Sequence, residues 1–524
     1  MITNLATPGV YIDEINAFPN SVVEVATAVP AFIGYTPQAT YEGQSYIMKP
    51  TKVTSMQEFN AIFAFPTPST PGAAAPKQYS PSYYIVKQKA APEKGDYYTV
   101  NGDIYTIEPD PNTIYYLYNS VQLYFANGGG EAYIVSLGSY GAGSGAGKDP
   151  GALIQNANLS VKDMQTGLQA LKKFPDVTMY IVPEATLLTS GDNLTIMQDM
   201  LAQAGAMQTA MTIFDIIGGQ DPDPISWPDD ITNFRNSTGN NDLKYGSAYY
   251  PFLNTTIVTS DLVDYTNING GDTTVLNDIL NPPTAPNSSA ASILSSIQSG
   301  SSDLTVSQNN QALIIASPTY KFIMGIIQAK MNIMPPSGIM AGVWSLTDST
   351  EGVWYAPANK TPMGVTSTTL QIDDTEQEGL NVDAVSGKSV NAIRFFNGQG
   401  VLVWGARTLD GNSQDWRYIN VRRTVTMIEQ SAKLALRAYV FAPNTSNTWA
   451  TIKSMLENFL TNTWKQGALA GAKASDAFSV EIGLGTTMTS QDILDGYLRV
   501  AIKIAVSHPA EFIVLQVQQE QQKS

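Results

Sequence analysis

The residues that come closest to a chemical motif form the glycine-rich stretch GAGSGAGKD at positions 141–149. A phosphate-binding P-loop needs a glycine five residues before the glycine of its Gly-Lys pair, and a serine or threonine after the lysine. Ala142 takes the first of these positions, and Asp149, whose carboxylate would repel phosphate, takes the last. The stretch therefore predicts a flexible linker or a long surface loop rather than a nucleotide site.

Two acidic clusters and one histidine are the other candidates for chemistry. The clusters could be imagined as a calcium site and as a glycosidase pair: Asp221, Asp223, Asp229 and Asp230, and Asp373, Asp374, Glu376 and Glu378. The first lacks the glycine and the bidentate glutamate of an EF-hand loop, and any acidic loop satisfies the second pattern. His508 lies between two apolar runs, directly before a proline, where a structural role is the ordinary explanation. We therefore expect no catalytic residue, no cofactor, no metal and no enzyme activity.

Composition narrows the possible classes further. The 524 residues suggest two to four domains. The chain has no cysteine, which excludes disulfides, thiolate metal sites and a cysteine nucleophile. Its single histidine leaves no room for a multi-histidine metal site. A hydrophobic content of 43% excludes wholesale disorder.

The charge is distributed unevenly. A net charge of −16 argues against direct nucleic-acid binding, because phosphate contacts need clustered lysine and arginine. Residues 416–524, however, hold 11 basic and 8 acidic residues, a net of +3, whereas the other 415 residues hold 18 and 37, a net of −19. We therefore expect a partner surface in the C-terminal part.

The N-terminal residues MITNLATPGVYIDEI contain neither a basic segment nor an apolar core of the kind that signal peptides have. No run of the chain approaches 18 consecutive apolar residues. We therefore expect no membrane insertion by this chain and folding in the cytoplasm of the producing cell.

Periodicity predicts the elements that must position these residues. Helix-like stretches at 161–174 and 194–212 alternate with short strands at 178–182 and 212–217, as in an α/β unit. Apolar spacing predicts a helix over 421–440, with Arg422 and Arg423 off its apolar face. A second helix is expected from a cap at Asn447 or Thr448 to Gly467. Strict alternation predicts strands at 478–484 and 498–506.

An apolar run lies near each end of the chain, and each run is set off by a Pro-Gly or His-Pro pair. The side chains of interest are Val10, Tyr11, Ile12 and Ile15 at one end, and Phe512, Ile513, Val514, Leu515 and Val517 at the other. Such runs either add strands to a neighbouring subunit's sheet or fold back into their own domain. The residues alone do not favour one over the other.

The chain resembles the contractile tail sheath family of bacteriophages and of phage-tail-like extracellular contractile injection systems. The resemblance covers the first 135 residues and nearly everything after Pro335, but is patchy between them. Its segments are 7–15 (TPGVYIDEI), 28–36 (AVPAFIGYT), 123–135 (LYFANGGGEAYIV), 247–253 (SAYYPFL), 335–359 (PPSGIMAGVWSLTDSTEGVWYAPAN), 390–409 (VNAIRFFNGQGVLVWGARTL), 416–449 (WRYINVRRTVTMIEQSAKLALRAYVFAPNTSNTW), 458–471 (NFLTNTWKQGALAG), 476–485 (DAFSVEIGLG) and 508–517 (HPAEFIVLQV).

The resemblance implies a mixed α/β (α+β), multidomain fold. A conserved inner sheath domain would be built from both chain ends, with N- and C-terminal arms that exchange strands between subunits, and outer domains would be inserted into it. The expected segments are an N-terminal arm (1–20), the N-terminal part of the conserved region (21–135), variable outer insertions (136–334), a conserved C-terminal sheath domain (335–506) and a C-terminal arm (507–524).

The resemblance also implies a structural function. Sheath subunits polymerise as stacked hexameric rings around an inner tube and contract to drive that tube through a target cell envelope. The implied partners are further copies of the chain, the inner tube protein, and baseplate and terminator or cap proteins. Assembly would take place in the cytoplasm of the producing bacterium, and the product would be a released extracellular or virion-like particle.

Two interpretations stay open alongside this one. An acidic, β-rich adhesin or surface-layer protein would share the composition but predicts a secretion signal, and a carbohydrate-active enzyme predicts a paired-carboxylate cleft. Within the family, the compact tail end and the Asn/Ser-rich insertions favour a headless injection particle over a true phage tail. We also expect Lys453 and Lys465, on the helix over 447–467, to contact an acidic tube; the alternative is that they only solvate the helix.

Overall fold

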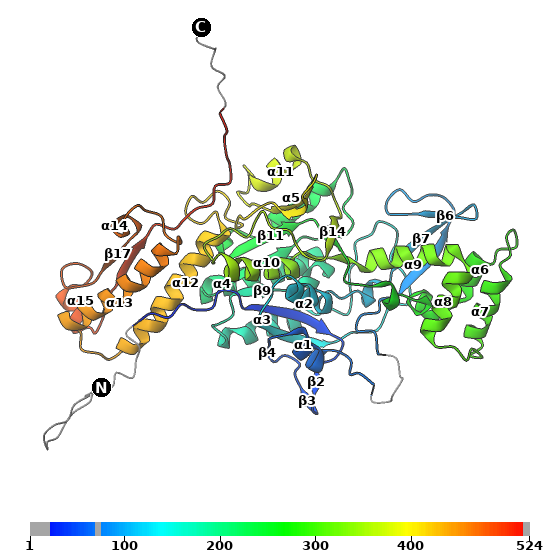
Figure 1. Ribbon diagram of the computed structural model, residues 1–524, viewed down its shortest axis with the longest axis horizontal. Helices are drawn as coiled ribbons and strands as arrows, with labels where there is room; N and C mark the ends of the chain where they lie inside the picture. Colours follow the sequence, from blue (N-terminus) through cyan, green and yellow to red (C-terminus); the bar gives the residue numbers. More distant parts are fainter. Residues whose placement is uncertain (1–20, 69–74, 517–524) are drawn as a thin grey trace, which may run out of the picture. The chain divides into compact units, whose positions relative to one another are not determined.

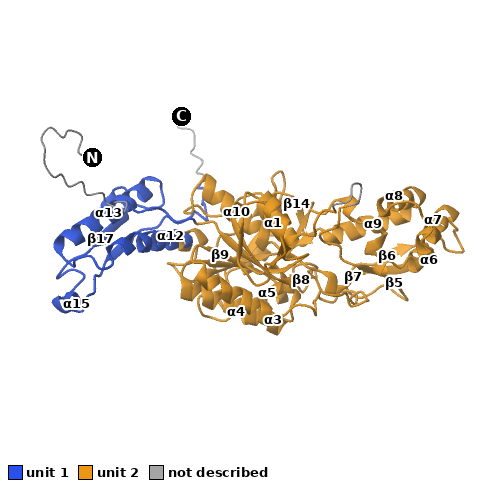
Figure 2. Ribbon diagram, turned by 90° about the horizontal axis from the view of Figure 1, so that it is seen from below, with its two compact units in different colours: residues 1–26, 423–524 blue, residues 27–422 orange. Residues whose placement is uncertain are grey.

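The computed structural model describes residues 21–68 and 75–516, and the chain forms two compact units (Figure 2). Unit 1 comprises residues 1–26 and 423–524, and unit 2 comprises residues 27–422. The mixed α/β, multidomain class is confirmed. The two units are defined by which residues pack together. The five expected segments instead describe conserved and variable parts of a family, so the division into five segments stays a prediction.

Unit 2 is built around an eight-stranded sheet (Figure 1). Its order is β16 (Gly400–Val403), β15 (Asn391–Phe396), β11 (Gly246–Tyr250), β10 (Met211–Asp215), β9 (Met179–Ile181), β1 (Pro30–Thr36), β8 (Ala132–Ser139) and β4 (Thr51–Val53). The six inner strands are parallel, and the two edge strands, β4 and β16, run antiparallel to their neighbours. The register pairs residues far apart in sequence, for example Ala31 with Tyr180.

Both faces of this sheet are covered, as parallel strands require. Strand β1 is buried along its whole length: Ile33 belongs to one hydrophobic layer and Phe32 to the other. The first layer is closed by α3 (Val161–Ala170), α4 (Ser190–Met207) and α5 (Trp227–Ser237). The second is closed by α1 (Met56–Phe63), α2 (Leu117–Ala126) and α10 (Ser337–Thr350). The predicted alternation of helices and strands is confirmed.

The rest of unit 2 consists of smaller elements. An antiparallel sheet of β5 (Tyr83–Gln88), β7 (Asp103–Pro109) and β6 (Tyr98–Val100) lies with α6 (Thr274–Leu280), α7 (Ser288–Gln298), α8 (Val306–Ala316) and α9 (Pro318–Met331). The remaining elements are the sheet of β13 (Ile333–Met334), β12 (Leu253–Thr255) and β14 (Val365–Thr368), the hairpin of β2 (Thr40–Tyr41) and β3 (Gln44–Ser45), and α11 (Asp374–Asn381).

Unit 1 contains two long helices and a two-stranded sheet. Helix α12 (Ile419–Leu436) begins in unit 2 and continues into unit 1, followed by α13 (Ser446–Lys465), α14 (Ala474–Ala477), β17 (Phe478–Glu481), α15 (Ser490–Leu494) and β18 (Ala501–Ile504). The predicted helices are confirmed. The strands are shorter than expected because Gly483 and Gly485, with φ of 151° and 80°, end β17 in a turn. Within residues 21–68 and 75–516, every helix is too short or too polar to cross a membrane.

Arg422 and Arg423, which were predicted to lie off the apolar face of their helix, are nevertheless buried. Their exposed fractions are only 2% and 5%. The Arg422 guanidinium lies over the ring of Trp416, 4.3 Å from its centroid, and 5.2 Å from the centroid of Tyr245. Helical periodicity treats every charged side chain as solvated, whereas a planar guanidinium can be buried against aromatic faces.

Candidate functional site

The sheet of unit 1 consists of two strands, and beyond the end of β18 the described residues extend it only by a bridge between Leu469 and Val506. Strands β17 and β18 pair antiparallel from Phe478 with Ile504 to Glu481 with Ala501, and the pair buries Val480. Among the described residues, each strand has only the other as its neighbour in this sheet. A two-stranded sheet is marginal by itself, and its outer edges present unpaired N–H and C=O groups. The sheet can therefore accept a further strand.

The C-terminal segment after this sheet is an exposed apolar run. The exposed fractions of Phe512, Ile513, Val514 and Leu515 are 72%, 86%, 92% and 84%. Complete burial of one such side chain is worth about 1.5–3 kcal/mol. A partner that covers the run would therefore gain several kcal/mol. The other residues expected in the arms, Val10, Tyr11, Ile12, Ile15 and Val517, lie outside the described residues.

Helix α13 presents the two candidate lysines on different sides. Its buried stripe, which includes Ile452, Leu456 and Phe459, faces the core of unit 1, and both lysines are exposed. Lys453 Nζ lies 3.7 Å from a carboxylate oxygen of Glu457, one turn further on. Lys465 is in the last turn and has no ion pair among the described residues. Twelve residues of helix separate them by about 18 Å and about 120° around the axis. Lys465 is therefore the more available cation of the two.

The loop between α12 and α13 carries an apolar pair that the sequence analysis missed. Val440 is 61% exposed, and Phe441 is completely exposed with a φ of 70°. A bulky side chain in this left-handed region costs free energy, and such outliers cluster at functional positions. The sequence signal for an exposed apolar pair was present: two large apolar residues follow the charged end of a predicted helix and precede Pro443.

The glycine-rich loop 141–149 holds a carboxylate of its own chain. The buried Asp110 accepts hydrogen bonds from the backbone N–H of Ser144 (3.0 Å), its hydroxyl (2.7 Å) and the N–H of Gly145 (3.0 Å). Lys148, at the P-loop lysine position, pairs with the buried Glu108 at 3.2 Å. The loop is long, as expected, but these contacts fix its position.

Two further carboxylates fill positions where α/β sheets commonly bind anions. Connections in this sheet diverge between β1 and β9, and ligands bind at such points. There the fully buried Glu184 accepts a hydrogen bond from the N–H group of Tyr35 on β1. It also accepts hydrogen bonds from the N–H groups of Tyr116 and Leu117 at the start of α2. Asp215, the last residue of β10, accepts hydrogen bonds from the N–H and hydroxyl of Ser337 at the start of α10. Burial raises the pKa of Glu184 to about 8 and that of Asp215 to about 7.

The other candidate residues make ordinary structural contacts. Asp373 caps α11 together with Glu376, and Asp374 pairs with Arg394 at 2.8 Å. Asp223 accepts hydrogen bonds from the N–H groups of Ile225 and Ser226. His508 Nδ1 lies 2.9 Å from the carbonyl oxygen of Val506. Within the described residues, no three His, Cys, Asp or Glu side chains are grouped so as to hold a metal ion.

Comparisons with known families match the C-terminal half of the chain. The phage tail sheath protein central domain matches residues 286–409, and the phage tail sheath C-terminal domain matches residues 412–520. The tail sheath protein of Vibrio phage KVP40 is 24% identical over 150 residues, 29% of this chain and 22% of that protein. A putative prophage major tail sheath protein of Pseudomonas aeruginosa (strain UCBPP-PA14) is 25% identical over 139 residues, 26% and 34% of the two chains. The matched regions therefore cover well under two thirds of the length of these two relatives.

Solved structures match over the whole chain. The PVC sheath complex of an extracellular contractile injection system, in its contracted state, has a TM-score of 0.57 at 24% identity and covers 99% of both chains. The contracted helical sheath of the anti-feeding prophage (AFP) has a TM-score of 0.59 at 23% identity and covers 99% of this chain and 100% of that one. The C-terminal part of the chain is thus similar to phage tail sheath domains, and the fold of the whole chain is that of contractile sheath subunits.

Proposed function

We propose that this protein is the structural subunit of the contractile sheath of a phage-tail-like injection system. Copies would stack as six-membered rings in a helix around an inner tube, and contraction would drive the tube through a target cell envelope. The matches of residues 286–409 and 412–520 to phage tail sheath domains and a sheath fold over 99% of the chain support this function. The subunit would do mechanical work and catalyse no reaction.

One observation carries the proposal: unit 1 has both an acceptor and a donor for strand addition. The acceptor is the open pair of β17 and β18, and the donor is the exposed run of Phe512, Ile513, Val514 and Leu515. In this arrangement the run of one subunit adds a strand to a neighbour's sheet, and residues 10–15 supply a second arm. A head-to-tail contact that does not close on itself produces a helix of subunits.

Strand exchange also provides a mechanism for contraction. The arms would keep subunits connected while their bodies rotate between a metastable extended packing and a more stable contracted one. A difference on the order of 5 kcal/mol per subunit suffices to shift a two-state equilibrium almost completely, and it adds up over many subunits. No nucleotide is then needed.

The proposed partners follow from the same arrangement. The positive C-terminal region, with Lys453 and Lys465, would contact an acidic inner tube, and baseplate and terminator or cap proteins would bind the two ends of the sheath. Subunits would assemble in the cytoplasm of the producing bacterium and leave as part of an extracellular particle. Neither membrane insertion nor direct nucleic-acid binding is proposed for this chain.

The sheath of a true contractile-tailed phage is the second candidate function. The match to the Vibrio phage protein favours it, but that match covers 29% of this chain. The injection-system structures cover 99%, and this supports the headless particle. A capsid gene beside the gene for this protein would favour the phage instead.

Truncation tests the sheath function and the arm separately. Negative-stain microscopy of the full chain, co-expressed with its tube protein, should show striated hollow tubes. A variant without residues 510–524 should remain folded but form no stable sheath, whereas a control without residues 518–524 retains the apolar run and should assemble. Monomers of the full chain under all conditions would contradict the sheath function. Normal tubes from the longer truncation would contradict arm exchange only.

Charge reversal tests the tube contact. Replacing both Lys453 and Lys465 by glutamate should abolish tube-templated assembly. The matched control reverses Lys172 and Lys173, two exposed lysines of unit 2, with the same change in net charge. Unchanged co-assembly of the first variant with its tube would remove the proposed contact.

A further inference from the structure

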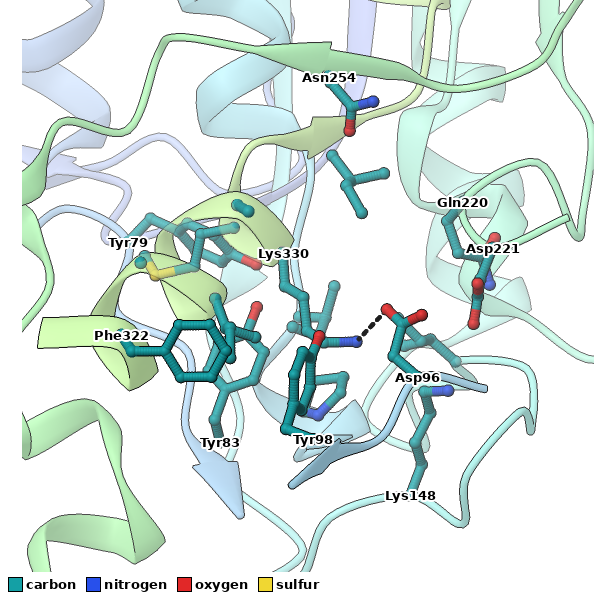
Figure 3. A pocket seen from close by; sticks show the side chains of 18 of the residues that line it. Tyr79, Tyr83, Asp96, Tyr98, Lys148, Gln220, Asp221, Asn254, Phe322 and Lys330 are labelled. Atoms are coloured by element: carbon teal, nitrogen blue, oxygen red, sulfur yellow. Dashed lines mark ion pairs between the residues drawn. The ribbon is translucent and has the colours of Figure 1, made fainter. Parts of the chain in front are cut away.

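Unit 2 contains a cavity that the sheath function does not use (Figure 3). Its volume is about 640 Å³, within the usual range for small-molecule sites. Residues that line it come from β5, β6 and α9 and from the segment that contains Gln220 and Asp221. All of them lie in unit 2.

One wall of the cavity is aromatic. It includes Tyr79, Tyr83, Tyr98 and Phe322, and the rings of Tyr98 and Phe322 meet edge to face at 5.9 Å. Burial raises the pKa of Tyr98 to about 12, so that its phenol is protonated at neutral pH. A flat ligand with an apolar face can stack on this wall.

Three buried, uncharged polar side chains line the cavity without protein partners. Tyr83, Tyr116 and Gln220 are 2%, 4% and 7% exposed, and none of their side chains has a hydrogen bond to another described residue. Because these three side chains line the cavity and have no partner among the described residues, their polar groups are available to a ligand inside it. Each of the three can both donate and accept a hydrogen bond. They therefore suit ligand hydroxyl groups, which do the same.

The charges around the cavity balance. Lys330 Nζ lies 3.7 Å from a carboxylate oxygen of Asp96, and Lys148 is paired with Glu108. Asp221 and Lys321, one of each sign, also line the cavity and have no ion pair among the described residues. An anionic or cationic ligand would meet no excess of opposite charge here.

Helix α9 lines the cavity partly with small residues, which leave its volume unfilled. Gly325 and Ala329, one turn apart, line the cavity with the smallest side chains. A Cβ added at Gly325 would meet no atom within 4 Å. A larger residue at this position would enter the cavity without disturbing the helix.

We propose that this cavity binds a neutral carbohydrate of one to three sugar rings. A pyranose ring has a face of C–H groups for the aromatic wall and a rim of hydroxyl groups for Tyr83, Tyr116 and Gln220. A site that hydrogen-bonds hydroxyl groups discriminates against ligands that lack them. The subunit would thus bind sugars in addition to forming a sheath.

Saturation-transfer NMR on the full chain tests this proposal. The probes are common neutral hexoses, pentoses and N-acetylhexosamines and their dimers, with glucuronate, glucosamine and phenylacetate as charged probes. At least one neutral sugar should receive saturation, and the charged probes should not. No signal from any neutral sugar, or signal from charged probes alone, would overturn the proposal.

Two variants connect the signal to the cavity. Gly325→Leu should fill the space and abolish the signal, whereas Gly379→Leu, at a glycine of α11 with equally open surroundings, should leave it unchanged. Gln220→Leu should weaken binding about tenfold or more while leaving the melting temperature equal or higher, because it removes an unpartnered amide. Equal signals in wild type and Gly325→Leu would place sugar binding elsewhere and contradict the assignment.

Discussion

Units 1 and 2 differ in whether their polar backbone groups are hydrogen-bonded within the chain. In unit 2, the carboxylates of Asp110, Glu184 and Asp215 accept hydrogen bonds from loop and helix N–H groups that could otherwise bind an anion. In unit 1, both edges of the β17–β18 sheet lack a neighbouring strand among the described residues, and an apolar run is exposed. Unit 2 thus pairs these groups within itself, whereas unit 1 would gain further stability if another chain covered its exposed run and paired with its sheet.

The largest effect on stability is expected in the core of unit 2. Trp344 is fully buried in the layer that covers the central sheet, and its indole N–H donates to the hydroxyl of Tyr249 at 3.0 Å. Trp344→Ala should lower the free energy of unfolding by about 3–5 kcal/mol, as measured by urea denaturation. A loss below about 1 kcal/mol would mean that unit 2 does not depend on this core.

A smaller loss is expected where unit 2 binds its own glycine-rich loop. Asp110→Ala leaves the N–H groups of Ser144 and Gly145 without their acceptor, which should cost about 1–3 kcal/mol. Asp149→Ala, at an exposed position of the same loop, is the matched control and should cost little. Equal effects of the two substitutions would contradict the role of Asp110.

The buried carboxylates should make unit 2 less stable as the pH rises. Because burial raises the pKa of Glu184 to about 8, the native protein retains a proton that the unfolded chain releases above its ordinary pKa. This contribution to stability is complete at low pH and is lost as the pH rises through about 8. Urea denaturation between pH 5 and 8.5 should show the decline, and Glu184→Gln should flatten it. An unchanged slope in the variant would refute this explanation.

Substitutions in the exposed apolar run of unit 1 should have the smallest effect on stability. The same substitutions should have the largest effect on assembly. Ile513→Ser combined with Leu515→Ser should change the free energy of unfolding by less than about 0.5 kcal/mol, because both side chains are exposed. The same variant should form no stable sheath. A clear loss of stability in the isolated chain would show that the run packs within its own subunit.

Local patterns predicted the elements of unit 1 well. The helix expected over 447–467 is α13 (Ser446–Lys465), because its apolar spacing and the terminating glycine are encoded within twenty residues. The order of the central sheet was not predictable in this way, since it pairs strands such as β1 and β9 that lie about 150 residues apart.

The site was predictable only in part. The apolar run at 512–515 could be read from the sequence, but its exposure could not. The burial of Arg422 against Trp416 and the closure of the glycine-rich loop by Asp110 depend on tertiary contacts. The same holds for the cavity beside Gln220, whose lining comes from segments more than 200 residues apart.

The most direct test of the central claim uses the absence of cysteine from the chain. Each of residues 512–515 is replaced by cysteine in turn, together with Ser479→Cys on β17 or Lys503→Cys on β18, and assembled sheath is oxidised. Strand addition brings some of these pairs within disulfide distance, so at least one double variant should give a ladder of covalent multimers on a non-reducing gel, and the single variants should not. Normal tubes that yield only monomers, with or without an internal disulfide, would contradict strand exchange between subunits.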